Sequence, residues 1–505
     1  MKKRMSLFLA FVILISSLLG CFGACFAAEE DESSAVIEPA SIEPASFEVV
    51  SAEEAPDASL SEEESGESPE EDNAPIESVN RAAGEDGAGG TYDYGKSAVS
   101  GCVTLLVEYD EPLAGQPTTF HVSASGGSGA YKFRMDVPVY YNPDRTGYQT
   151  VGDPTRGDWA AYTSECESVD YIFAMTASGI YSFSFYAMDT TSQVYWLKVG
   201  FTITISDANY PSVASIVSSA VAQCREATDG SDYAKALWLH DWMIERVSFD
   251  NTLVWCSAES VLTRGLGICE GYKDAYALLL TAAGIENKEI RDIADGHTWN
   301  AVKLDGEWYQ IDATWNDSAY DGYDFDATHL YFGLTDELMA VAHEGHTAIY
   351  SAEGYETRST SLENNYFVRS EVAYQWVTAY YERIMTHLDA GETEFSIAAD
   401  NTTLPASISG IQNGIIAWVF NQLEWDGVLL QATASGTEFS FVADYCDING
   451  DKKLDVNDLI LLVKHLLGQA EAEKIVHGPD LNRDDAFNLA DVVYLLRRLV
   501  LLSAA

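Results

Sequence analysis

An amphipathic helix is predicted from residue 269 onward, because its apolar side chains recur at three- and four-residue spacing. The apolar positions are Tyr272, Ala275, Tyr276, Leu279, Leu280 and Ala283. Gly284 follows them, where a glycine in the left-handed conformation commonly ends a helix. A glycine-rich turn at residues 265–267 precedes the helix, so Cys269 is expected in its first turn.

A β-hairpin is predicted over residues 297–315, where two strand-like runs flank the turn signal Asp305-Gly306. If these two residues form the loop, Leu304 pairs with Glu307. Because side chains alternate between the two faces of a strand, this pairing fixes which residues of the hairpin share a face.

Three residues of this region have the chemistry of a nucleophile, a base and an orienting acid. Counting outward from the turn places His297 opposite Thr314 and on the same face as Asp312, about 7–8 Å away at the backbone. A carboxylate on one imidazole nitrogen leaves the other nitrogen for a thiol. The free N–H groups and dipole of a helix N-terminus favour the thiolate of Cys269. The sequence therefore predicts a catalytic triad of Cys269, His297 and Asp312.

The segments GLGICEGYKDAYALLLTAAGI and GHTWNAVKLDGEWYQIDATWND resemble the transglutaminase-like superfamily. The resemblance covers roughly residues 210–350 and implies a papain-like α+β fold. It implies that Cys269 accepts the acyl group, that His297 is the base and that Asp312 orients it. Relatives often carry an aromatic residue shortly before the cysteine. This chain has Glu259 there, so it departs from the family in the side-chain half of the oxyanion hole.

The resemblance implies an enzyme that acts on protein or peptide amides through an acyl-thioester. Hydrolysis by a cysteine peptidase is the preferred expectation, because bacterial members of the superfamily are often peptidases. Two alternatives remain open: a transglutaminase that cross-links proteins, and a catalytically inactive module that binds peptides or the cell wall.

Residues 446–505 carry a duplicated pattern in which a polar loop precedes an apolar helix, expected at residues 459–467 and 492–502. Each loop places Asp or Asn at positions 1, 3, 5, 9 and 12 and a backbone carbonyl at position 7, which is the ligand spacing of an EF-hand-like calcium site. The predicted ligands are Asp447, Asn449, Asp451, Lys453, Asp455 and Asp458, and then Asp480, Asn482, Asp484, Ala486, Asn488 and Asp491.

This duplicated loop and helix resembles a dockerin, the module that docks secreted proteins onto the cohesin domain of a scaffoldin in a cellulosome. The resemblance implies two calcium ions as cofactors and a cohesin as partner. The chain departs from the dockerin pattern at position 6, which is usually glycine and is here Lys452 in one loop and Asp485 in the other.

Residues 92–207 contain short alternating runs separated by Gly, Pro and Asp, a pattern that predicts a β-sandwich. The glycine-rich run at residues 123–133 resembles the hairpins of bacterial immunoglobulin-like modules. Residues 365–445 predict a small α+β module, whose first helix is expected to start after Ser370 and to continue to Leu388.

The charge balance is strongly acidic, because the 505 residues carry a formal net charge of -51. Such a charge repels nucleic acid and anionic membrane surfaces, so neither is an expected partner. Residues 29–91 are almost entirely Glu, Ser, Ala and Pro and are expected to be a disordered linker. Residues 1–28 are typical of a signal peptide, which predicts a secreted protein without a transmembrane segment. Residues 18–21 also resemble a lipoprotein cleavage box, so lipidation at Cys21 is an alternative.

Cysteines in an exported protein can form disulfides where they lie close together. Two pairings are left open, Cys102 with Cys166 and Cys224 with Cys256. Cys269 must stay reduced to act, and Cys446 is left over. His343 and His346 alone are a weak zinc signal, because no second pair of ligands accompanies them.

These patterns together predict a multidomain protein. The expected parts are a signal peptide at 1–28, an acidic linker at 29–91, an immunoglobulin-like β-sandwich at 92–207, a transglutaminase-like catalytic domain at 208–364, a small α+β module at 365–445 and an α-helical dockerin at 446–505.

Overall fold

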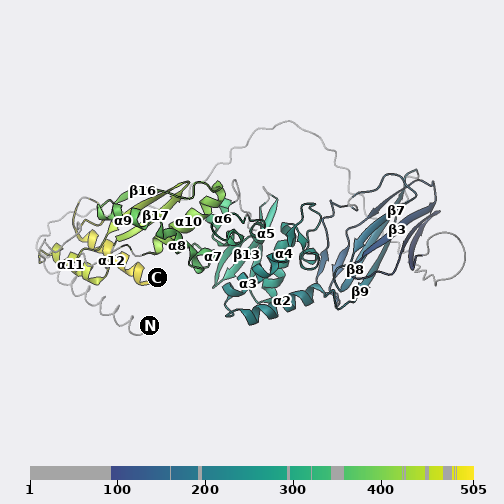
Figure 1. Ribbon diagram of the computed structural model, residues 1–505, viewed down its shortest axis with the longest axis horizontal. Coiled ribbons are helices and arrows are strands. Elements are labelled where there is room, and N and C mark those ends of the chain that lie inside the picture. The colour runs from purple at the N-terminus through teal and green to yellow at the C-terminus, as the bar shows by residue number, and fades with distance from the viewer. Residues whose placement is uncertain are drawn as a thin grey trace, which may run out of the picture. The chain divides into compact units, whose positions relative to one another are not determined.

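The computed structural model describes residues 92–504 except for 158, 160, 192–195, 293–295, 320, 343–357, 424, 426–427, 450–453, 470–479, 483 and 485 (Figure 1). The expected signal peptide and acidic linker lie outside the described residues, as do His343, His346, Asp451, Lys452, Lys453 and Asp485. Among the helices that the structure describes, none has both the length and the apolar character needed to cross a membrane.

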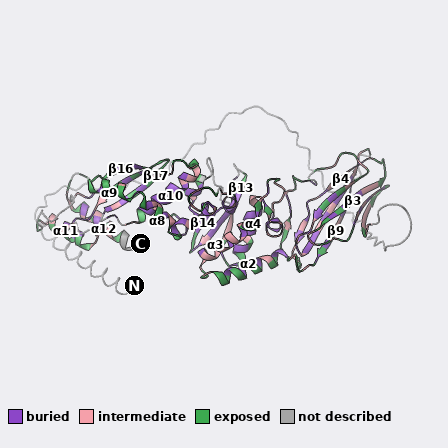
Figure 2. Ribbon diagram, viewed as in Figure 1, coloured by how far each residue is buried: buried purple, intermediate pink, exposed green. Residues whose placement is uncertain are grey.

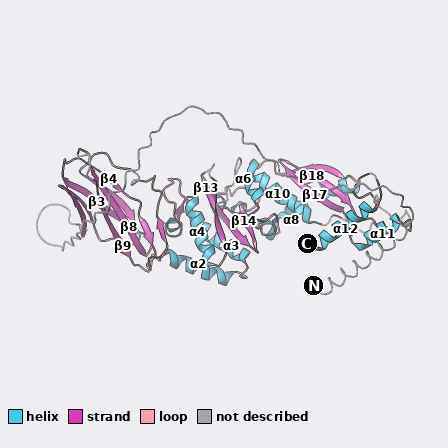
Figure 3. Cartoon of the chain, turned by 180° about the vertical axis from the view of Figure 1, so that it is seen from behind, coloured by secondary structure: helices cyan, strands magenta, loops and turns pink. Residues whose placement is uncertain are grey.

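The strands before residue 206 form two antiparallel sheets (Figure 3). One sheet has the order β1-β2-β3-β7; the other has the order β4-β8-β5-β6, with β9 also beside β8. The sheets pack through aromatic rings, because Phe120 lies 4.8 Å from Phe183 and 5.3 Å from Phe185. The alternating pattern therefore predicts two packed sheets correctly. The strands are β1 (Tyr94–Ser100), β2 (Val103–Tyr109), β3 (Pro117–Gly126), β4 (Tyr131–Met135), β5 (Val139–Tyr141), β6 (Tyr148–Thr150), β7 (Ser168–Ala174), β8 (Gly179–Asp189) and β9 (Trp196–Ile205).

Helices α2 (Val213–Ala227), α3 (Asp232–Ile244) and α4 (Cys269–Ala282) pack together after the sheets. Helix α4 begins at Cys269, as predicted, and Gly284 follows it with a left-handed φ of 83°. The helix lies against a four-stranded sheet of the order β12-β13-β14-β15. The strands of this sheet are β12 (Asn287–Asp292), β13 (His297–Leu304), β14 (Glu307–Ile311) and β15 (Phe332–Leu334).

The hairpin of β13 and β14 has the predicted turn, with positive φ at Asp305 and Gly306 and with Leu304 opposite Glu307. Its far end differs from the prediction, because the paired ladder stops where Asn300 faces Ile311. Helix α5 (Ala313–Asp317) follows instead of more strand, so His297 has no strand partner at Thr314.

The α+β module between residues 365 and 445 also differs from the prediction in its helices. Ser370 ends α7 instead of starting a long helix, and Glu371 adopts a left-handed φ of 63° that interrupts the helical path. The remaining span forms two helices, which separate at the buried Tyr380. The elements are α7 (Tyr366–Arg369), α8 (Val372–Thr378), α9 (Tyr381–Asp389), β16 (Glu394–Ala398), α10 (Ala406–Gln422), β17 (Val428–Ser435) and β18 (Glu438–Tyr445).

The last part of the chain contains α11 (Val456–Leu466) and α12 (Leu489–Ala504), which contact each other. Each helix starts three residues before its predicted start. The capping residue Asp455 explains the earlier start of α11, because its side chain accepts from the Asn457 N–H.

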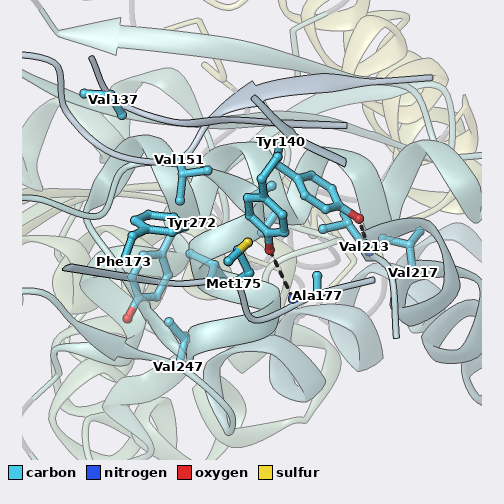
Figure 4. Packing of buried hydrophobic residues seen from close by; sticks show 14 of the residues in the cluster. Val137, Tyr140, Val151, Phe173, Met175, Ala177, Val213, Val217, Val247 and Tyr272 are labelled. Carbon is cyan, nitrogen blue, oxygen red and sulfur yellow. Dashed lines mark hydrogen bonds between the residues drawn. The ribbon is translucent and has the colours of Figure 1, made fainter. Parts of the chain in front are cut away.

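Buried side chains follow the inner faces of the sheets and helices (Figure 2). The core of the two N-terminal sheets continues into the helices, since Phe173 and Tyr272 belong to one buried cluster (Figure 4). Across this junction the Tyr140 hydroxyl accepts from the Val213 N–H at 3.2 Å. The described cysteines are free thiols, so neither of the two open pairings is present.

Candidate active site

Cys269 is the first residue of α4, after Ile268 in extended conformation. At this position its own N–H has no acceptor within the helix and is available to an oxyanion. The half-buried side chain lines a cleft of about 930 Å³. The helix that the apolar pattern predicts therefore presents this sulfur to a cavity.

His297 and Asp312 meet in the same region. Nε2 of His297 lies 2.7 Å from Oδ2 of Asp312. The Asp312 side chain is fully buried, and its other oxygen accepts from the N–H groups of Thr314 and Trp315. One carboxylate therefore caps α5 and binds the imidazole at the same time.

The protonation of His297 reflects its partners. Burial lowers the pKa of the imidazole, but the charge and hydrogen bond of Asp312 outweigh burial and raise it to about 10. A hydrogen bond with Cys269 and the charge of its sulfur add to the rise. Because Nε2 faces Asp312, Nδ1 is the nitrogen left for the sulfur. The three residues of the predicted triad are thus brought together.

Two indole rings hold the imidazole in place. The ring of His297 lies 5.5 Å from that of Trp299 and 5.4 Å from that of Trp315. Trp299 is itself fixed, because its Nε1 donates to Gln310 at 2.7 Å. The sequence pattern predicts no role for these tryptophans, although each lies within three residues of a predicted triad member.

A polar network, in which both histidines are buried, joins α3 to α5. Nδ1 of His240 and Nε2 of His329 both lie within 2.9 Å of one oxygen of Asp241. Nδ2 of Asn316 donates to Nε2 of His240 at 3.0 Å, so the His240 proton is on Nδ1 and is donated to Asp241. Nδ1 of His329 bonds a second carboxylate, that of Asp326. Burial lowers the pKa of His329, but these two acids outweigh burial and raise it.

The possible ligand atoms of His240, Asp241 and His329 lie within 4.8 Å of one another, close enough for a metal ion. The hydrogen bonds give a proton to each imidazole nitrogen that faces Asp241, so neither nitrogen offers a lone pair there. We therefore assign this cluster to positioning α5, whose Asn316 it binds.

Glu259 points away from the Cys269 cleft. Its fully buried carboxylate pairs with Arg264 at 3.2 Å. It also accepts from the hydroxyls of Tyr181 and Thr176, which belong to the N-terminal sheet region. The residue found in place of the family's aromatic side chain therefore ties the β-sandwich to the helical core and does not face the oxyanion.

The wall of the Cys269 cleft comes from several segments. The loop after β6 contributes Asp153 and Arg156, whose side chains lie 3.6 Å apart, and β12 contributes Arg291. Phe249 and Leu253 add apolar surface. The cleft can therefore accept a chain with both polar and apolar groups.

The two C-terminal loops repeat one hydrogen-bond arrangement. Oδ1 of Asp458 accepts from the N–H groups of Ile448 and Asn449, and its Oδ2 accepts from that of Asp455. Asp491 accepts in the same way from Leu481, Asn482 and Asn488. The position-12 carboxylate thus closes each loop.

Other predicted ligands lie in the same loops. Asp447 is buried beside Asp458, and burial, with the charge of Asp447 added, raises the pKa of Asp458. In the second loop the Asp484 N–H donates to Asp480, and the Ala486 N–H donates to Asp484. Two buried carboxylates with oxygen-bearing neighbours are a donor set that fits a hard dication.

Comparisons with known proteins agree with the chemistry of the cleft. Residues 219–313, which include Cys269, His297 and Asp312, match the family described as the transglutaminase-like superfamily. No curated protein matches the chain.

Three solved structures are similar over part of the chain. A TGase shares 15% identity over 22% of this chain and 32% of its own, with a TM-score of 0.18. A candidate cysteine protease from Cytophaga hutchinsonii shares 14% identity over 39% of this chain and 78% of its own, with a TM-score of 0.16. A candidate protease from Parabacteroides distasonis shares 10% identity over 41% and 63%, with a TM-score of 0.13. This chain therefore spans about a third of the length of the TGase. The family match shows that the chain contains a transglutaminase-like domain, and the matched residues include Cys269, His297 and Asp312.

Proposed function

We propose that this protein is a secreted cysteine peptidase that acts on protein or peptide amides. One observation carries the proposal: a cysteine at a helix N-terminus shares a cleft with an imidazole that is bonded to a buried carboxylate at 2.7 Å. This arrangement of nucleophile, base and orienting acid is the one that acyl transfer requires.

In the proposed reaction the Cys269 thiolate attacks the carbonyl carbon of an amide. The C–N bond breaks as the His297 imidazolium gives its proton to the leaving amine, and an acyl-thioester remains. Water then attacks the thioester while His297 takes its proton, and the C–S bond breaks to release the acid. Asp312 keeps the imidazole oriented throughout, and the Cys269 N–H is one donor to the oxyanion.

Mass spectrometry of peptide digests tests this proposal. Hydrolysis predicts new carboxylate termini that carry one oxygen from labelled water, and Cys269→Ala should form none. Transfer to a lysine-like amine in place of water would instead support cross-linking. Binding without turnover would support an inactive module.

We further propose that the C-terminal loops bind two calcium ions and dock onto a cohesin. The buried pair of Asp447 and Asp458 supports calcium binding, because a dication would offset their repulsion. Asn449 and Asp455 would join the first ion, and Asp480, Asn482, Asp484, Asn488, Asp491 and the Ala486 carbonyl would hold the second.

Circular dichroism of the full chain with EDTA and with calcium tests this second proposal. Calcium should raise helicity and allow capture by a cohesin. Asp458→Ala with Asp491→Ala should lose both effects, whereas Asp389→Ala, an exposed acid outside the loops, should keep them. Equal helicity in both conditions would defeat the folding claim, and cohesin capture by the double variant would defeat the docking claim.

A further inference from the structure

Two further hollows lie beyond the Cys269 cleft, and one of them adjoins it. The middle hollow, of about 290 Å³, shares Trp315 and Ser318 with the cleft. The distal hollow, of about 580 Å³, shares Tyr323 with the middle one. These common residues place the three hollows in a series from Cys269 to the α+β module, for which the sequence predicts no function.

The distal hollow is lined by amide, aromatic and acidic side chains. Side-chain amides come from Gln375, Asn401 and Gln412, and aromatic surface comes from Trp376 and Tyr380. The carboxylates of Asp324 and Asp400 also line it, and Asp400 is paired with Arg383, whereas neither lysine nor arginine is among the lining residues. Such a wall does not select an anion, and its amide groups match the donors and acceptors of a peptide backbone.

The side-chain oxygen of Asn401 has no hydrogen-bond donor among the described residues. Its Nδ2 donates to Oε1 of Gln412 at 2.5 Å and to Oδ1 of Asn413 at 2.9 Å. Asn413 is oriented in turn by its own bond to the Gly436 carbonyl. These bonds fix which way the Asn401 amide faces, and they leave its buried Oδ1 without a hydrogen bond among the described residues. A buried acceptor without a donor is costly, and a turn of the Asn401 side chain toward the hollow would let this oxygen accept an N–H from a ligand.

We propose that the three hollows form one groove and that the distal hollow binds the backbone of the substrate polypeptide, several residues from the bond that is cleaved. The inference rests on the proposed peptidase function for the identity of the ligand. The middle hollow supports a polypeptide over a saccharide, because Leu330 and Ile408 give it an apolar wall that suits a side chain. In this account the α+β module determines specificity for long substrates.

The test measures binding to the Cys269→Ala protein, so it does not depend on turnover. Two peptides share the residues around the bond, and one extends further by about six residues, which is about 20 Å of extended chain. The longer peptide should bind about tenfold more tightly, as expected for a few added contacts and one buried hydrogen bond. Ala379→Trp should remove this gain by filling the distal hollow.

Ala379 suits this test because it is exposed and caps the C-terminal end of α8. Ala390 is a matched control, exposed at the same position of α9 and outside the hollow, and Ala390→Trp should keep the gain. Asn401→Ala should also reduce the gain while leaving the short peptide unaffected.

The proposed groove would be wrong if the two peptides bound equally tightly, or if Ala379→Trp kept the full gain in affinity for the longer peptide. It would also be wrong if a neutral oligosaccharide displaced the long peptide but an unlabelled peptide did not. If the protein with Cys269 intact cleaved no peptide, the result would count against the proposed peptidase activity and not against the groove. Peptide binding and its dependence on length are measured separately from cleavage.

Discussion

His297 is the residue on which the proposed chemistry depends most. Its pKa of about 10 means that the ring is an imidazolium at neutral pH, so a cation lies beside the sulfur of Cys269. The sulfur also lies at the N-terminus of α4, the positive end of the helix dipole.

The pH profile of hydrolysis follows from this pKa. The charge of His297 is present below about pH 10 and is lost as the pH rises through that value. The alkaline limb of kcat/KM should therefore lie near pH 10, far above the roughly 6.5 of an unperturbed histidine. The raised pKa also adds folding stability, which is full below the unfolded value and is lost as the pH rises through about 10. An alkaline limb of kcat/KM close to pH 7 would contradict the assignment of His297 as the acid and base of the reaction.

Asp312→Asn separates the two roles of this side chain. Asparagine can still accept from the Thr314 and Trp315 N–H groups, so the cap of α5 and the fold should remain. The carboxylate charge on His297 is lost, so acylation should slow on the order of 10³- to 10⁴-fold and the alkaline limb should fall. Asp312→Ala should in addition lose about 1 kcal/mol of stability with the cap. Unchanged acylation in the Asn variant would remove Asp312 from the mechanism.

At the scale of elements, α4 and the β13–β14 turn could be predicted from the sequence, and α5 could not. Apolar spacing and the Asp305-Gly306 signal are local, so they identify the helix and the register at the turn. The change from strand to helix at Asp312 depends on a cap whose other oxygen is held by His297, a contact between distant residues. The sequence therefore predicts that His297 and Asp312 lie close together, but it predicts a longer strand pairing where the structure has α5.

The His240 network could not be predicted either, because its members come from α3, α5 and the segment before β15. Periodicity places His240 on a buried helix face, but only the fold supplies its partners. Glu259 is a similar case. The family resemblance places this position at the oxyanion hole, whereas the structure pairs Glu259 with Arg264.

Asn316 is expected to act as a positioning residue through α5. Its Oδ1 accepts from the Tyr331 N–H at 2.9 Å, and its Nδ2 donates to His240. Asn316→Leu leaves both buried groups unsatisfied, so stability should fall by roughly 2–4 kcal/mol. Because Asp312 caps α5, kcat on a short substrate should fall and its alkaline limb should shift, with KM little changed.

Asn413→Leu is the matched control for this substitution. Asn413 is also buried and hydrogen-bonded, but it lies in the α+β module. It should lose comparable stability while keeping the kcat and pH profile on the short substrate. The positioning role would be wrong if both variants lowered kcat equally at a temperature where both are folded.

At the scale of the whole molecule, the N-terminal sheets take part in the candidate active site. They supply Asp153 and Arg156 to the cleft, and the buried Glu259–Arg264 pair joins them to the helical core. Arg264 also donates to the Ala174 carbonyl at 2.8 Å. These contacts make the N-terminal part of the described chain a wall of the cleft.

Removal of Arg264 should destabilise this junction. Arg264→Leu leaves the buried Glu259 charge unpaired, at a cost of roughly 3–5 kcal/mol. Adding Glu259→Gln removes that charge and should restore much of the loss. Thermal unfolding of the single and double variants measures this difference, and equal destabilisation of both would argue against a buried ion pair at the junction.

Competitive alkylation of the cysteine thiols tests whether Cys269 is the nucleophile. Cys269 should react first with iodoacetamide at about pH 6, where an unassisted thiol is almost fully protonated. Burial raises the pKa of Cys224, and it raises that of Cys256 to about 12, so these two should react slowly, while exposed Cys102 is the reference thiol. His297→Ala should abolish the preference for Cys269. Faster labelling of Cys102 or Cys446 than of Cys269 in the native protein would contradict the account.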